Sequence, residues 1–103
     1  MKKQIGTVFV DSGSVWVGDP CYVIGGDASH AVEDWNAYHK NLTDLGFWGN
    51  QDASIEPLGI GVGMHIQTYW GDGEYPVFAE MEDSGRIKSI TIDLYGEDDE
   101  NVL

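Results

Sequence analysis

The chain has 103 residues, 42% of them hydrophobic and 12% aromatic, which is enough for one domain with one core. Its 18 acidic and 5 basic residues give a formal net charge of −13, and direct nucleic-acid binding is disfavoured because phosphate contacts need a basic surface. The single cysteine, Cys21, excludes an intramolecular disulfide and suits a reducing cytosol, and no apolar run is long enough to cross a membrane.

The chain opens with a pattern that predicts a β-hairpin. Side chains alternate over residues 4–10, residues 11–14 have the composition of a turn, and residues 15–18 form a second short strand. Pro20 cannot donate a hydrogen bond to a neighbouring strand, so we expect the second strand to end before it.

One helix is predicted, over residues 29–42. Asp27 or Ser29 is placed to cap its first turn. Apolar and aromatic side chains recur at helical spacing, so we expect one helical face to pack on a sheet.

Residues 43–59 are rich in Gly, Asn and Asp and predict a long loop. Phe47 and Trp48 interrupt it. These two side chains either enter the core or form an exposed aromatic anchor for a partner.

Three later segments predict an antiparallel meander, over residues 61–70, 75–82 and 86–95. Turn-forming residues separate them. Gly85 is expected to adopt positive φ in the second turn.

These elements predict a mostly β, α+β fold with one helix, arranged as a small antiparallel β-sandwich or open barrel on which the helix packs. We expect residues 1–96 to form a single β-rich domain. Residues 97–103 begin with four successive acids and predict an acidic, flexible tail.

Two motifs stand out, GDPCY at residues 18–22 and GDGEYP at residues 71–76. With residues 11–13 and the strand at 90–94, they make the chain resemble a family of small bacterial and phage-encoded proteins that has no settled activity. The resemblance covers about half the chain and does not extend over the helix or residues 43–59. It implies a β-rich domain and the cytosol of a bacterial host.

The two motifs contribute one carboxylate each, Asp19 and Asp72. If their loops meet at one end of a sheet, the pair is able to bind a divalent cation or to act in acid–base chemistry. The alternative is that both are turn residues bonded to nearby backbone N–H groups. Their spacing matches no Ca²⁺ loop, and no metal or cofactor is predicted.

Aromatic residues lie in or near the same motifs. The aromatic residues Tyr22, Tyr69, Trp70 and Tyr75, with Asp19 and Asp72, are candidates to line a small-ligand or nucleotide pocket. They are equally suited to capping one end of the β-core.

Cys21 with His65 is a permitted nucleophile–base pair, but no motif supports it. We expect Cys21 to be a buried structural residue, and the chain not to be an enzyme.

The charge distribution leads to the functional prediction. Between Gln4 and Gly85 the only base is Lys40, against thirteen acids. We expect a non-enzymatic acidic protein, phage-encoded, that binds and inhibits a basic host protein, a nuclease or other nucleic-acid-binding factor, its carboxylates standing in for phosphates.

Two alternatives remain open. One is a pocket protein that binds or hydrolyses a small ligand, and the other is a structural or assembly component. If the chain binds a basic host protein, the predicted contacts are acids in exposed or edge positions: Glu33, Asp34, Asp44, Asp52, Glu80 and Glu82.

Overall fold

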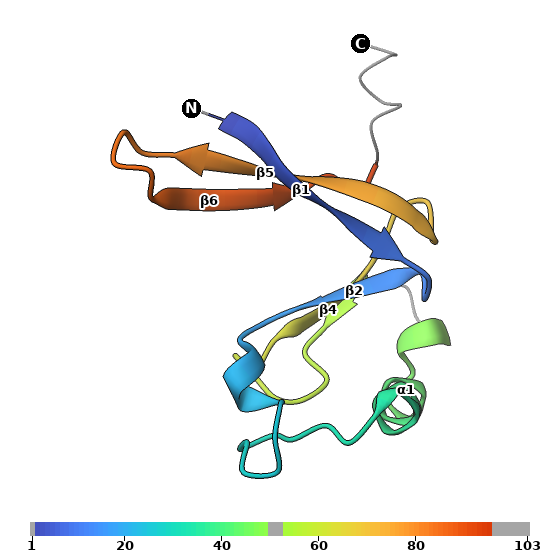
Figure 1. Cartoon of the computed structure of the whole chain (residues 1–103). Coiled ribbons are helices and arrows are strands. Elements are labelled where there is room, and N and C mark those ends of the chain that lie inside the picture. Colours follow the sequence, from blue (N-terminus) through green and yellow to red (C-terminus); the bar gives the residue numbers. More distant parts are fainter. Residues whose placement is uncertain (1, 50–52, 96–103) are drawn as a thin grey trace. The chain divides into compact units, whose positions relative to one another are not determined.

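The computed structural model describes residues 2–49 and 53–95. The chain is mostly β with one α-helix, as predicted (Figure 1). Its elements are strands β1 (Lys2–Val10), β2 (Ser14–Val17), β3 (Ser54–Ile55), β4 (Met64–Gln67), β5 (Gly73–Met81) and β6 (Ile87–Ile92), helix α1 (Trp35–Asp44), and short 3-10 turns η1 (Pro20–Tyr22) and η2 (Phe47–Gly49).

The chain divides into two compact units. The terminal unit contains residues 1–14 and 68–103, and the central unit contains residues 15–67. Each unit carries most of one three-stranded sheet.

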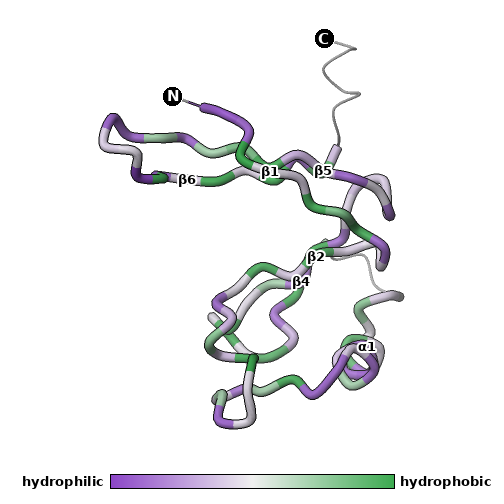
Figure 2. Tube along the Cα trace, viewed as in Figure 1, coloured by the Kyte–Doolittle hydropathy of each residue, from purple (hydrophilic) through white to green (hydrophobic). Residues whose placement is uncertain are grey.

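In the terminal unit, β5 lies between β1 and β6 and pairs antiparallel with both. The buried residues Val10, Tyr75 and Ala79 form its core. The predicted β5–β6 hairpin is confirmed, and Gly85 has φ +92° in its turn. Figure 2 shows hydrophilic residues at both ends of β5.

Two predicted pairings are wrong. β4 does not join β5 in a meander, and β1 does not form a hairpin with β2, because β1 occupies the edge of β5 and β2 pairs with β4. The register of β1 with β5 runs from Lys2 opposite Glu80 to Val10 opposite Gly73. β2 has only four residues, so β5 offers β1 a much longer ladder of backbone hydrogen bonds.

In the central unit the strand order is β2-β4-β3, with β3 antiparallel to β4. Its core includes Leu42, Phe47 and His65. Phe47 is fully buried while Trp48 beside it is partly exposed, so the two aromatic residues of the predicted loop have different environments. That loop also contains η2 and β3.

Helix α1 begins later than predicted. Asp34 is extended, and its Oδ1 accepts a hydrogen bond from Ala37 N at 2.9 Å, so Asp34 is the cap in place of Asp27 or Ser29.

No helix in the described part of the chain is both long enough and apolar enough to cross a bilayer.

Candidate functional site

The segment that leads into β5 is held by hydrogen bonds to its buried residues. Thr68 N and Thr68 Oγ1 each lie 3.1 Å from Gly13 O, and Thr68 Oγ1 lies 2.5 Å from Gly71 O. The buried Tyr75 hydroxyl donates to the same Gly71 oxygen at 2.7 Å. The residues between Thr68 and Gly73 are therefore presented on a fixed backbone.

This segment presents exposed aromatic rings. Tyr69 is 65% exposed and Trp70 is 59% exposed, and both contact the ring of Tyr95, which is 41% exposed. The ring centroids are 4.8 Å apart for Tyr69–Trp70, 4.6 Å for Tyr69–Tyr95 and 5.4 Å for Trp70–Tyr95. Trp70 Nε1 donates to Tyr95 O. We call these three residues the aromatic cluster.

Carboxylates lie at the same end of the sheet. Asp72 and Glu74 are exposed and lie on either side of Gly73, the first residue of β5. Asp11 directly follows Val10, which lies opposite Gly73 in the β1–β5 register. We call Asp11, Asp72 and Glu74 the acidic end.

A fourth acid, Asp93, directly follows β6 and holds Tyr95 of the aromatic cluster. Asp93 N donates to Pro76 O at 3.0 Å, and Asp93 Oδ1 accepts from Tyr95 N at 3.1 Å. These bonds set the position of Tyr95 beside the beginning of β5.

The opposite end of the same sheet holds the basic residues. Lys2 lies opposite Glu80 in the β1–β5 register, Lys3 follows it, and Lys88 precedes Ser89, the β6 partner of Glu80. Arg86 O accepts from Glu82 N. The predicted contacts Glu80 and Glu82 are thus placed among the four bases of the terminal unit: Lys2, Lys3, Arg86 and Lys88.

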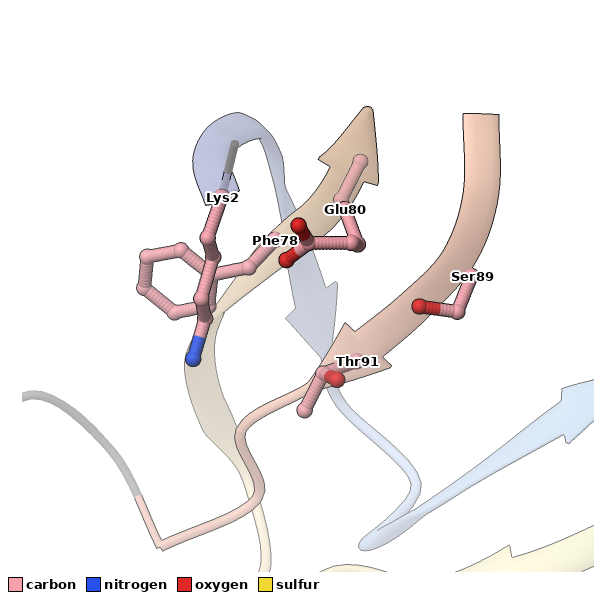
Figure 3. A pocket seen from close by; sticks show the side chains of 6 residues that line it. Lys2, Phe78, Glu80, Ser89 and Thr91 are labelled. Atoms are coloured by element: carbon pink, nitrogen blue, oxygen red, sulfur yellow. The ribbon is translucent and has the colours of Figure 1, made fainter. Parts of the chain in front are cut away.

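A hollow of about 210 Å³ lies on this basic end, and Figure 3 shows the side chains that line it. Lys2 Nζ lies 5.0 Å from the centroid of the Phe78 ring, a cation–π distance, and Glu80, Ser89 and Thr91 line the remainder. The lysine and the aromatic ring therefore already have each other as partners.

The predicted contacts in the central unit have different environments. Asp34 caps α1, and Asp44 Oδ2 forms an ion pair with Lys40 Nζ at 2.8 Å. Glu33 is exposed and lines two surface hollows of about 270 and 410 Å³ with Ala31 and Val32. Asp52 lies outside the described residues, as does the predicted tail at 97–103.

The residues predicted to line a ligand pocket are divided between the units. Asp19 and Tyr22 belong to the central unit, while Tyr69, Asp72 and Tyr75 belong to the terminal unit. Asp19 Oδ1 accepts from Cys21 N at 3.0 Å and caps η1, so it has the role of a turn residue. Tyr75 is a core residue.

Cys21 is exposed, which corrects the prediction that it is buried. It lies in η1, a short surface turn that begins at Pro20, three residues after the end of β2. A hydrogen bond with Asp19 raises the pKa of the Cys21 thiol, and the charge of Asp19 adds to that effect. The thiol is thereby less able to form the nucleophilic thiolate.

His65 is not placed to activate Cys21. It is 2% exposed, and its Nδ1 lies 2.9 Å from the Tyr38 hydroxyl. The His65 ring also packs edge-on against Phe47 and Trp48. The sequence pattern of β4 does not predict these contacts of His65, because Tyr38, Phe47 and Trp48 come from other segments of the chain.

A catalytic metal site finds no support in the described residues, among which no group of three or more His, Cys, Asp or Glu side chains is placed to hold an ion. Comparison of the chain with protein-family models, with curated proteins and with solved structures finds no match.

Proposed function

We propose that this chain is a non-enzymatic acidic protein that binds a basic, nucleic-acid-binding protein in the cytosol of a bacterial host, and that it inhibits that protein by occupying its nucleic-acid-binding surface. The observation that carries the proposal is the exposure of its carboxylates. Of the thirteen acids in the described part of the chain, all except the half-buried Glu80 and Asp93 are exposed.

Few bases offset these acids. Lys40 is the only Lys or Arg of the central unit, and it is already paired with Asp44. The other four bases lie together at one end of the terminal sheet. The remaining surface of each unit is therefore negative, which favours fast encounter with a positively charged partner.

The small-ligand alternative has less support. It needs Tyr75 and Asp19 to face a ligand, whereas the Tyr75 hydroxyl is bonded in the core and the Asp19 carboxylate caps a turn.

Affinity capture from bacterial lysate tests the proposal. Chain immobilised at low salt should retain nucleic-acid-binding proteins, and both high salt and duplex DNA should elute them. Salt should do so because interactions between exposed charges are screened over about 8–10 Å at physiological ionic strength. A retained protein that neither salt nor DNA releases would contradict the proposal.

A further inference from the structure

We propose that Tyr69 and Trp70, together with Asp72 and Glu74, form the contact that receives an arginine side chain of the basic partner. The inference rests on the proposed function and identifies which part of the surface performs it. It begins from the aromatic cluster, which is exposed although its rings are large and apolar.

The position of these rings is set before any partner arrives. Before Trp70, Thr68 is bonded to Gly13 O, and after Trp70 the Thr68 and Tyr75 hydroxyls both bond to Gly71 O. The Asp93 carboxylate accepts a hydrogen bond from Tyr95 N and holds the chain there. A partner that binds a preorganised surface loses less conformational entropy than one that must order it. The fixed backbone around Tyr69 and Trp70 therefore favours their use as a contact surface for a partner.

The neighbouring charge identifies the ligand. Asp72 lies two residues after Trp70, and Glu74 is the second residue of β5, so two exposed carboxylates lie within four residues of Trp70 in the chain. An arginine guanidinium stacks on aromatic faces and pairs with carboxylates in two parallel hydrogen bonds, and it therefore uses both kinds of group. The four bases of the unit lie at the far end of the sheet, where they do not repel such a ligand.

Other flat ligands stack on aromatic rings as well. A nucleotide carries a negative phosphate beside its base and is repelled by the acidic end, and a neutral sugar gains nothing from the negative field. A charged guanidinium is the ligand that benefits from all the observed features.

Two peptides of equal length test the inference, an oligo-arginine peptide and an oligo-citrulline peptide that keeps the shape but has no charge. Full-length chain should bind the first and not the second at low salt. Trp70→Leu should weaken binding of oligo-arginine by about fivefold, and Trp70→Phe should weaken it less, because phenylalanine retains an aromatic face. Asp72→Asn with Glu74→Gln should weaken it by about threefold or more.

Matched controls come from elsewhere in the chain. Trp35→Leu removes another half-exposed indole, and Asp27→Asn with Asp83→Asn removes the same charge from two exposed positions outside the acidic end. Both should bind oligo-arginine almost as the parent chain does, and circular dichroism should show that each variant is folded.

The outcomes separate the inference from the proposed function. Binding of oligo-arginine that neither Trp70→Leu nor the Asp72→Asn, Glu74→Gln double variant weakens would overturn the inference and leave the proposed function standing. Equal binding of oligo-citrulline would overturn the arginine contact, since charge would then be irrelevant. No binding of either peptide would contradict both.

Discussion

The hydroxyl of Tyr38 lies 2.9 Å from Nδ1 of His65, and this pair joins helix α1 to strand β4 inside the central unit. Burial raises the pKa of Tyr38 to about 12 and lowers the pKa of His65 below its ordinary 6.5. Both side chains are therefore neutral at pH 7, and the hydrogen bond is one between uncharged partners.

Removing the hydroxyl should cost stability. Tyr38→Phe leaves His65 Nδ1 without this partner in the core, so we expect the free energy of unfolding to fall by about 1–2 kcal/mol. Urea denaturation of the two proteins at pH 7 measures it. An unchanged midpoint would show that the hydrogen bond makes no net contribution.

The same histidine predicts a pH dependence. Because the folded-state pKa is lowered, the unfolded chain takes up the proton first as pH falls, so stability is full above about pH 6.5 and is lost as pH falls below it. Denaturation at several pH values between about 5 and 7, above most carboxylate pKa values, measures the loss. His65→Asn should flatten the slope, whereas the exposed His30→Asn should not; equal slopes in all three proteins would contradict the assignment.

Cys21 should react slowly with alkylating reagents despite its exposure. Its hydrogen bond with Asp19 raises the thiol pKa, so the reactive thiolate is scarce at neutral pH. Asp19→Asn should lower the thiol pKa and speed alkylation by iodoacetamide at pH 7. If the parent chain and the variant react at the same rate across a pH series, Asp19 does not control this thiol.

Gly85 is the position where the β5–β6 turn depends on glycine. Its φ is +92°, and a Cβ there would meet no atom within 4 Å, so only backbone strain opposes substitution. Gly85→Val should lower the free energy of unfolding by about 1–2 kcal/mol. Gly6→Val, where φ is not positive and space is also open, is the control for thermal melting. Equal melting temperatures in the two variants would refute this reading of the turn.

The elements predicted well are those specified by neighbouring residues. Alternation and a turn with Gly85 predict the β5–β6 hairpin, which the structure contains. The partner of β1 is more than sixty positions away in the sequence, and alternation carries no information about such pairing. The sequence predicts a helix that starts too early, because Ser29 and Asp34 are both suitable capping residues. The extended backbone of Asp34 in the structure shows that Asp34 is the cap.

The candidate site was predicted only in part. The sequence indicates Asp72 in the GDGEYP motif and Tyr69 and Trp70 just before it. The association of Tyr95 with Trp70 depends on the bonds of Asp93, which no local pattern indicates. The sequence indicates Glu80 and Glu82 as acids in exposed or edge positions of a strand, without their neighbours. The register that places them beside Lys2 and Arg86 becomes visible only once β1 and β6 flank β5.

The most direct test of the central claim is competition for a partner's nucleic-acid site. A basic protein captured from lysate is mixed with fluorescently labelled duplex DNA, and anisotropy reports the bound DNA as the acidic chain is added. We predict that the chain displaces the DNA, and that displacement weakens steeply as salt rises. A partner that binds the chain and the DNA together, with anisotropy unchanged or raised, would contradict the account.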